Sequence, residues 1–426
     1  MTIRTLQDQE LSMAKEIWQT CFDDQPAFVD WYFANRIKPH EVMGYFQPNA
    51  DHSLLADLHM APYQLRLRNK VFPCAYLIAL ATRPEYRNRG IAKELLRHTL
   101  THLAERGVFF SILLPFDIRF YTRLGWGVIS RHQTIQVKAS LTQNIQDPPL
   151  ASPALASSGQ TVPGSKNIKH FAKTYPEEIQ QLQVIYEKWV ERFDSTLLRE
   201  PRDWAGLLFD HYLDGGEVVF SNTRINGHTK PSGYALVLST EKKTTIREIA
   251  YNSLEAGEEL WQRLSNTGSS GLIWTAPISD PLVNLVISKA SAEKLGEPTI
   301  FKNPYMLGRI TDLAGFVKQV PHPNLTFNLH LEVHDPLLPQ NCGVFELYPA
   351  ENGMFGFTPS SKPPEIRCEI SLFTELLAGE ALSLKESGNG SRSPASARGL
   401  WVREKKYLSV LRKVFPQTVN YLNDYF

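Results

Sequence analysis

The sequence predicts an α/β protein in which mixed sheets are built in successive units. Two observations lead to this fold class. Apolar runs of strand length alternate with helix-period segments, and the same order of elements occurs twice along the chain. In both cases a helix comes first and the strands of a mixed sheet follow. A length of 426 residues is enough for two to three domains of about 150 residues each.

The first unit is expected to span residues 1–138, with two helices before most of its strands. The expected helices are Gln9–Thr20, Pro26–Arg36, a segment from Ile91 to Gly107, and a helical turn at Phe120–Leu124. The expected strands are Glu41–Phe46, Ser53–Met60, Tyr63–Leu67, Cys74–Ala81 and Phe109–Leu114.

Residues 139–167 are rich in turn-forming Pro, Ser and Gly, which predicts a linker. The second unit, 168–305, is expected to hold helices Glu177–Phe193 and Leu254–Leu264 and strands Glu217–Ser221, Gly233–Ser239, Lys243–Tyr251 and Gly271–Thr275. The third unit, 306–426, is expected to hold strands Thr326–Val333, Gly343–Leu347 and Glu365–Ile370, helices Ser371–Ala378 and Leu400–Val414, and a mobile loop at Glu386–Arg398.

The composition describes an ordinary globular chain of 42% apolar and 21% charged residues. Its net charge of +1 predicts neither nucleic acid nor an anionic membrane as a partner. The four cysteines form no CxxC pair, and His98 and His102 lack a third ligand, so neither a disulfide frame nor a metal site is expected. With no signal peptide and no membrane span in the sequence, we expect a cytoplasmic protein.

The segment Arg87–Ala92 fits the pattern R-x-x-G-x-A and lies between the apolar strand Cys74–Ala81 and the helix that begins at Ile91. The first amides of a helix have no internal acceptor and lie at the positive end of its dipole, so they can cradle a pyrophosphate. Gly90 and Ala92 keep this approach free of bulk. A P-loop is excluded because no Gly-Lys-Ser/Thr follows.

This strand, loop and helix resemble the coenzyme A site of the GCN5-related N-acetyltransferases (GNAT). Further segments resemble the Eis (enhanced intracellular survival) family within that group. These are Phe120–Gly127, similar to Y-x-R-x-G-[YW]-G; Ile185–Trp189 with Leu197–Arg199, similar to IYERW…LLR; and Leu307–Leu313 with the terminal Tyr425 and Phe426. The resemblance implies two GNAT-like domains followed by a sterol-carrier-like domain, and a homohexamer. The second domain is expected to be degenerate, because Tyr251–Ser253 replaces its coenzyme loop.

The resemblance also implies the site and acetyl-CoA as cosubstrate, with no metal. The expected coenzyme-binding residues are Leu80, Ala81, Thr82, Arg87, Asn88, Arg89, Gly90, Ile91, Ala92, Lys93, Phe116 and Asp117. Tyr121 is expected to be the general acid, because a phenol with a pKa of about 10 stays protonated at neutral pH. The implied general base is the terminal carboxylate of Phe426, carried back to the first domain.

The expected acceptor is a primary amine of a small polycationic molecule such as an aminoglycoside. Such a substrate calls for acidic side chains and aromatic walls, and Phe22, Asp24, Trp31 and Asp424 are the residues expected to supply them. An acetyltransferase of protein lysines or polyamines remains an alternative, since these acceptors also present a primary amine. A non-enzymatic carrier of acyl-CoA or lipid is a third possibility, but a pure carrier has no need for both the R-x-x-G-x-A loop and Tyr121.

Overall fold

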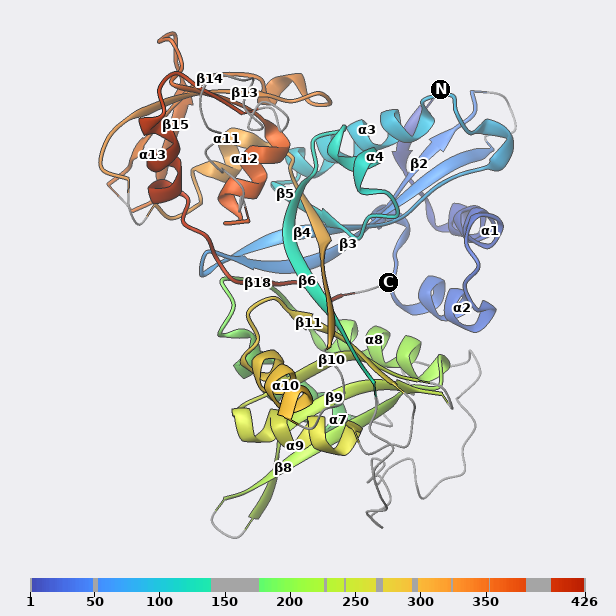
Figure 1. The fold of residues 1–426 in the computed structure, drawn as a ribbon. Coiled ribbons are helices and arrows are strands. Elements are labelled where there is room, and N and C mark those ends of the chain that lie inside the picture. The colour runs from blue at the N-terminus through green and yellow to red at the C-terminus, as the bar shows by residue number, and fades with distance from the viewer. Residues whose placement is uncertain are drawn as a thin grey trace.

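The computed structural model describes residues 2–48, 53–138, 176–225, 228–240, 243–265, 271–292, 298–322, 325–351, 353–380 and 400–424. Three lobes are visible, which we call the first (2–138), second (176–310) and third (311–418) lobes (Figure 1). The predicted linker at 139–167 and loop at 386–398 lie outside the described residues, as do Tyr425 and Phe426.

The first lobe is a sheet with helices on both faces. Its elements are β1 (Thr2–Thr5), α1 (Leu11–Cys21), α2 (Pro26–Asn35), β2 (Val42–Phe46), β3 (Leu54–Leu67), β4 (Lys70–Thr82), α3 (Ile91–Glu105), β5 (Phe110–Leu113), α4 (Ile118–Thr122) and β6 (Gly127–Lys138). Trp18 and Phe28 of α1 and α2 join one apolar core, whereas Leu95 and Leu100 of α3 join another. The two cores lie on opposite faces of the sheet.

Strand β3 is a single strand of 14 residues, and not the two expected strands Ser53–Met60 and Tyr63–Leu67, which left out Pro62. Pro62 pairs with Ala75 of β4, but its carbonyl faces away from β4 and accepts a hydrogen bond from Arg202 (2.9 Å). In an antiparallel ladder the nitrogen and carbonyl of one residue face the same side. The missing N–H of Pro62 therefore removes no hydrogen bond to β4, and the strand continues.

The second lobe also combines helices with the strands of a sheet. Its elements are α7 (Pro176–Val190), β7 (Ser195–Leu198), α8 (Pro201–Leu213), β8 (Glu217–Ile225), β9 (His228–Ser239), β10 (Thr244–Tyr251), α9 (Leu254–Ser265), β11 (Gly271–Pro277), α10 (Pro281–Ala292) and β12 (Thr299–Ile310). Helices α8 and α10 were not expected. Each begins with a proline, at Pro201 and Pro281, which suits the first turn of a helix.

The first two lobes share one sheet with the order β1-β2-β3-β4-β5-β12-β6-β11-β10-β9-β8. β12 lies between β5 and β6 and is antiparallel to both, and β6 continues into the second lobe by pairing with β11. The boundary expected at residues 305 and 306 thus falls inside β12, a strand that belongs to both lobes.

The third lobe has a separate five-stranded sheet with the order β15-β14-β13-β16-β17. Its elements are α11 (Leu313–Val317), β13 (Leu329–His334), β14 (Gly343–Pro349), β15 (Phe355–Pro359), β16 (Ile366–Glu369), α12 (Ile370–Leu377), β17 (Trp401–Val402) and α13 (Lys406–Val414). The helix expected from Leu400 begins later, because Trp401 and Val402 pair with β16. The Glu375 carboxylate of α12 accepts a hydrogen bond from the Val128 amide (3.0 Å), which joins this lobe to β6.

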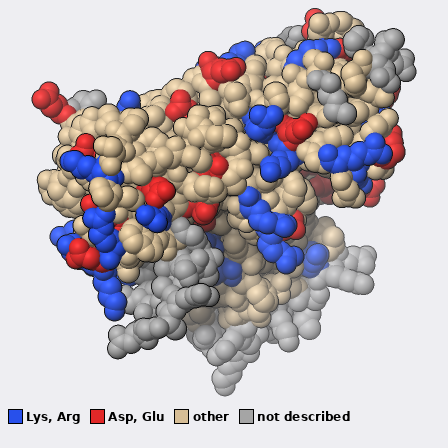
Figure 2. Space-filling view, turned by 90° about the horizontal axis from the view of Figure 1, so that it is seen from above, with Lys and Arg blue, Asp and Glu red and all other residues tan. Residues whose placement is uncertain are grey.

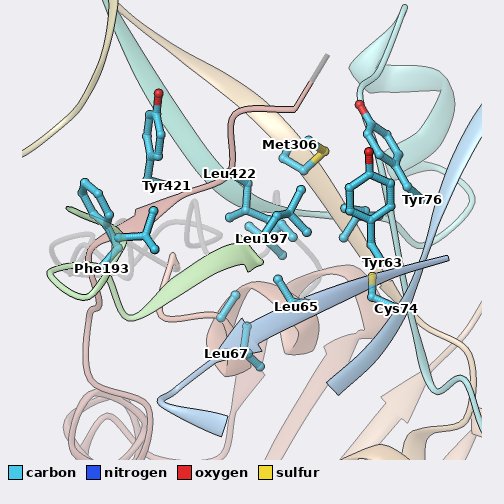
Figure 3. Close-up of a cluster of buried hydrophobic side chains, with 14 of the residues drawn as sticks. Tyr63, Leu65, Leu67, Cys74, Tyr76, Phe193, Leu197, Met306, Tyr421 and Leu422 are labelled. Atoms are coloured by element: carbon cyan, nitrogen blue, oxygen red, sulfur yellow. The ribbon is translucent and has the colours of Figure 1, made fainter. Parts of the chain in front are cut away.

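After α13 the chain returns to the junction of the first two lobes. This C-terminal tail (residues 419–424) contains β18 (Asn420–Tyr421), which runs parallel to β7, while β7 itself pairs with β3. Figure 3 shows Tyr421 beside Phe193, and Leu422 near Leu197 and Met306. The tail therefore lies in the apolar core where the lobes meet.

Charged side chains of both signs alternate on the face of the molecule seen in Figure 2. This mixture agrees with the nearly neutral net charge of +1. In the described part of the chain, no helix has the length and apolar character needed to cross a membrane.

Candidate active site

The parallel strands β4 and β5 pair over only a short stretch, Cys74–Tyr76 with Phe110–Ile112, and then separate. β4 runs on to Thr82, and a cavity of about 150 Å³ lies beside the part that has lost its neighbour. The lining is mostly apolar and consists of Phe22, Leu58, Tyr76, Leu77, Ile78, Ala79, Leu80, Leu96, Leu113, Leu114, Phe116 and Tyr121. An extended ligand can pair with such an open strand edge as an added strand.

A β-bulge in β4 lies at the wall of this cavity. His59 of β3 is opposite Ile78, but Asp57 is opposite Ala81, so Ala79 and Leu80 share a single partner position. Ala79 has a φ of +54°, in the left-handed region that non-glycine residues rarely adopt. Bulges of this kind redirect a strand and are common beside active sites. Here the bulge bends the open edge of β4 at the cavity.

The loop after β4 ends in a left-handed turn that opens α3. Asn88 and Gly90 have φ values of +61° and +80°. The Glu94 amide donates to the Gly90 carbonyl (3.2 Å), so the earlier amides of Ile91 to Lys93 have no acceptor within the helix. These amides can bind an anion at the positive end of the helix dipole.

The two arginines of the loop fix its shape. The Arg87 guanidinium donates to the Thr82 carbonyl (3.1 Å), and that of Arg89 donates to the Glu85 carbonyl (2.9 Å). Arg89 also lies over the Tyr86 ring, 5.2 Å from its centroid. Both positive charges therefore stay at the mouth of the helix, where they add to the field that favours a phosphate.

Replacing Gly90 with alanine is expected to weaken acetyl-CoA binding by about tenfold. An L-residue at positive φ costs roughly 1–2 kcal/mol, which the loop relieves by leaving the conformation that presents the α3 amides. Binding must then restore that conformation, and each 1.4 kcal/mol corresponds to a factor of about ten in affinity. Gly107, at the other end of α3, is a matched control: its φ is +75° and an added Cβ would meet nothing within 4 Å, as at Gly90. Calorimetric titration should show a raised Kd for Gly90→Ala and not for Gly107→Ala. Equal dissociation constants would contradict the assignment of the loop.

Tyr121 forms the end of the cavity opposite the loop. It lies on α4, whose first turn is capped by the Asp117 carboxylate accepting from the Arg119 amide (2.8 Å). The side chain is 5% exposed and contacts the rings of Phe116 and Trp126, with centroids 5.4 and 5.8 Å away. Burial raises the pKa of the Tyr121 phenol above its ordinary value. The phenol therefore stays protonated at neutral pH.

Two protein families match parts of this architecture. The acetyltransferase (GNAT) domain matches residues 2–129, and the sterol carrier protein domain matches residues 313–389. The chain carries a GNAT acetyltransferase domain. The protein is therefore an acetyltransferase, and the GNAT match covers the separated strands, the loop and Tyr121.

The whole chain is also similar in fold to several solved structures. A probable N-acyltransferase from Enterococcus faecalis is 18% identical with a TM-score of 0.72, covering 100% of this chain and 99% of the other. A GNAT protein from Anabaena variabilis is 20% identical with a TM-score of 0.71, and Eis1 from Mycobacterium abscessus is 18% identical with a TM-score of 0.70; both comparisons cover 100% of both chains. No curated protein sequence matches this chain.

The expected coenzyme-binding residues of the GNAT domain lie along one path. Leu80 and Phe116 line the cavity, and Phe116 is 76% exposed. Ala81 and Thr82 end β4, Arg87 to Gly90 form the loop, and Ile91 to Lys93 form the first turn of α3. Asp117, in contrast, caps α4 with its carboxylate, so its role is to begin the helix that carries Tyr121.

The four residues expected to bind the acceptor do not lie together. Phe22 lines the cavity, and Asp24 is exposed close by, accepting a hydrogen bond from the Trp18 indole (2.8 Å). Trp31 does not reach the cavity. It is buried and packs on Phe28 and on Phe209 of α8, with centroids 6.2 and 5.1 Å away, so it belongs to the contact between the first two lobes.

Asp424 also lies elsewhere than expected. Its side chain is 0% exposed, and its carboxylate accepts from the Arg199 Nε (3.2 and 3.4 Å). Burial raises the pKa of Asp424 to about 6, although Arg199 acts in the opposite direction. This carboxylate is occupied by an ion pair and does not face an acceptor. The Asp424 carbonyl, however, accepts from the hydroxyl of the cavity residue Tyr76 (2.9 Å).

Sequence reasoning missed the polar residues that hold this end of the chain. Arg199 belongs to the motif Leu197–Arg199, but no role could be assigned to it from the sequence. It makes a bidentate pair with Glu248 (2.8 and 2.9 Å), a charged residue inside an apolar strand. The position of Glu248 in that strand could have revealed the pair, because a buried carboxylate needs a partner. Phe426 lies outside the described residues, and Asp424 is the last residue that the structure places.

Proposed function

We propose that the protein transfers the acetyl group of acetyl-CoA directly to a primary amine of a polycationic acceptor. The observation that carries this proposal is the continuous path from the amides of α3, along the open edge of β4, to Tyr121. A pyrophosphate at Ile91–Lys93 and a pantetheine arm paired with Leu80–Thr82 would bring the thioester to the cavity beside Tyr121. The described part of the second lobe offers no comparable loop, because Ser253 caps α9 by accepting from the Ala256 amide (3.3 Å).

In the proposed reaction the amine nitrogen attacks the thioester carbonyl carbon and loses a proton to the terminal carboxylate of Phe426. Backbone amides on the open edge of β4 are available to stabilise the oxyanion of the tetrahedral intermediate. The C–S bond then breaks, and Tyr121 donates its proton to the leaving thiolate. Because burial raises the pKa of Tyr121, the phenol is in its protonated form and has a proton to donate.

A polycationic acceptor is supported by the charges beside Phe22. Asp24 lies at the turn between α1 and α2, and the Gln25 side-chain amide donates to Asp214, the residue that follows α8 (3.2 Å). Asp210 and Asp214 both pair with Arg247, so the cluster formed by these two residues and Asp24 has three carboxylates and one guanidinium. Burial raises the pKa of Asp210 to about 6, with Arg247 opposing and Asp214 and Asp24 adding to the shift. The excess negative charge suits several ammonium groups, and the resemblance to the Eis family points to aminoglycosides.

Thiol release from acetyl-CoA, measured with a panel of aminoglycosides, polyamines and lysine peptides, tests the proposal. We expect release with polycationic small amines, abolished or strongly lowered by Tyr121→Phe. Preference for lysine peptides would identify a protein acetyltransferase instead. If no amine accelerates release above the rate without acceptor while acetyl-CoA still binds, the transfer function fails and an acyl-CoA carrier remains.

We also propose that the protein is cytoplasmic and assembles as a homohexamer, as the Eis resemblance implies. Light scattering on the purified chain at micromolar concentration should give a mass near six times 48.4 kDa. A monomer as the sole species would contradict the proposed assembly.

A further inference from the structure

The second lobe keeps the strand geometry of the GNAT domain. β10 and β11 are parallel and pair only through Thr244–Ile246 and Leu272–Trp274, as β4 and β5 do through a similarly short stretch. β10 also carries a bulge just after its pairing with β11 ends, as β4 does after its pairing with β5. Ile246 and Glu248 are opposite consecutive residues of β9, so Arg247 is the extra residue. The second lobe therefore retains the bulged strand at which the first lobe forms its cavity.

The chain's own C-terminal tail lies against this bulge. The Asn423 side-chain amide donates to the Arg247 carbonyl (3.2 Å) and to the Glu248 carboxylate (3.0 Å). The Tyr421 hydroxyl donates to the same carboxylate oxygen, Glu248 Oε2 (3.4 Å). The side chains of Tyr421, Asn423 and Glu248 are all buried. The tail is therefore part of the interior of the second lobe and not a strand on its surface.

Arg199 is the centre of this contact. Its guanidinium makes a bidentate pair with Glu248, donates to the Asp424 carboxylate through Nε, and donates to the Asn423 carbonyl through Nη2 (2.7 Å). The ring of Tyr186 lies below the guanidinium, with its centroid 4.2 Å from Cζ. Only the planar, five-donor guanidinium can meet two carboxylates and a carbonyl at once in this fixed arrangement.

The motifs of the second lobe acquire a shared role here. Ile185–Trp189 supplies Tyr186 to the guanidinium and Trp189 to the tail, with the Trp189 ring 4.8 Å from that of Tyr421. Leu197–Arg199 directly follows Ser195 and Thr196, the residues of β7 that pair with β18, and supplies the arginine itself. Both motifs thus converge on the tail and not on a ligand cavity of the second lobe.

The charged groups of this cluster are better suited to fixing the position of the tail than to stabilising the fold. Burial would raise the pKa of Glu248, but Arg199 and the hydrogen bonds to Glu248 hold it below its ordinary value. The neighbouring Asp424 is a second carboxylate on the same guanidinium. Buried ion groups generally stabilise a fold less than apolar residues of similar volume, yet breaking one is costly. Such a cluster is suited to holding one chain segment in one place.

We propose that the second lobe is a dock for the C-terminal tail, and that Arg199 is the positioning residue that fixes where the tail enters the first lobe. The tail is held on both sides of its last described residue: Arg199 binds the Asp424 carboxylate, and Tyr76 of the cavity binds the Asp424 carbonyl. The described tail therefore ends at a fixed point, with Asp424 bound to a residue of the cavity. The kinetic consequence rests on the proposed function, because it requires the Phe426 carboxylate to be the base.

Hydrogen exchange of the tail in the full-length protein tests the dock without relying on activity. Arg199→Lys keeps one positive charge between the two carboxylates, so folding should survive, but a lysine cannot make the bidentate and Nε contacts together. Asp424→Ala removes the second contact and leaves Arg199 and Glu248 paired. Both variants should raise the exchange rate of the tail peptide by at least about tenfold, since a hydrogen bond to a charged group is worth a factor of that order. The β4 peptide should stay protected.

Val419→Ala is the matched control, because Val419 lies in the same tail, is 36% exposed and makes no side-chain contact with Arg199. Unchanged exchange of the tail in both Arg199→Lys and Asp424→Ala would overturn the dock, whatever happens to turnover. Faster exchange with lower kcat and an unchanged KM for acetyl-CoA would support both the dock and the base. Faster exchange with unchanged kcat would support the dock and reject Phe426 as the base.

Discussion

A short peptide added after Phe426 should abolish turnover or leave only a small residual rate, while acetyl-CoA binding and folding persist. The addition converts the terminal carboxylate into a neutral amide and places bulk where the acceptor amine must approach. Folding should survive because the described tail is held by contacts that end at Asp424, including the Tyr76 hydroxyl on its carbonyl (2.9 Å) and Arg199 on its carboxylate. The same peptide added before Thr2 is the control and should leave kcat unchanged.

Deleting Phe426 alone should have a comparable effect. The deletion keeps a terminal carboxylate but moves it back by one residue, or about 3.3–3.6 Å of extended chain. Proton transfer needs heavy atoms within roughly 3 Å or one bridging water, so the displaced group cannot serve the same amine. Equal kcat for the tagged, truncated and unmodified enzymes would remove the terminal carboxylate from the mechanism. Asp24, at the acceptor side of the cavity, would then be the next residue to test.

Tyr121→Phe should lower kcat by about 10²–10⁴-fold and leave the Kd for acetyl-CoA nearly unchanged, as general acid catalysis typically contributes this much. The substitution removes only the hydroxyl, and the ring contacts with Phe116 and Trp126 can remain. Because burial raises the pKa of Tyr121, the unmodified enzyme should retain its acid on the alkaline side of neutrality. The pH profile should therefore show no loss from this group below the ordinary tyrosine range at about pH 10.

Tyr348→Phe is the control for this substitution, because Tyr348 is a half-buried tyrosine of β14 in the third lobe and does not line the cavity. Steady-state kinetics and calorimetric titration on both variants separate chemistry from binding. A kcat for Tyr121→Phe equal to that of Tyr348→Phe would exclude Tyr121 as the acid. A large rise in Kd for acetyl-CoA would instead assign the hydroxyl to coenzyme binding.

The parts of the site that the sequence could predict are those formed by neighbouring residues. The strand Cys74–Ala81, the loop at Arg87–Gly90 and the helix from Ile91 are one local unit, and the structure has each of them in place. Apolar periodicity and the special backbone needs of Gly90 are properties of short windows, so they can be recognised without knowing what lies across the sheet.

The parts that could not be predicted depend on residues far apart in the chain. Asp424 looked like an exposed acid near a terminus, but it is buried because Arg199, more than two hundred residues earlier, supplies its partner. Trp31 looked like a wall of the acceptor site, but it packs on Phe209 of the second lobe. An acidic or aromatic side chain has the same local signature in either setting, and only the tertiary contact decides its role.

The insertion of β12 between β5 and β6 also has a consequence for how the enzyme is made. Phe110 of β5 pairs with Ile310, so the sheet beneath the cavity remains open until the ribosome has synthesised most of the chain. Contacts of such large sequence separation close late and slow the folding of β structure. Until then β5 and β6 present unpaired edges, which are templates for aggregation. We therefore expect the acetyltransferase domain, although continuous in sequence, to complete its sheet only after β12 has been synthesised.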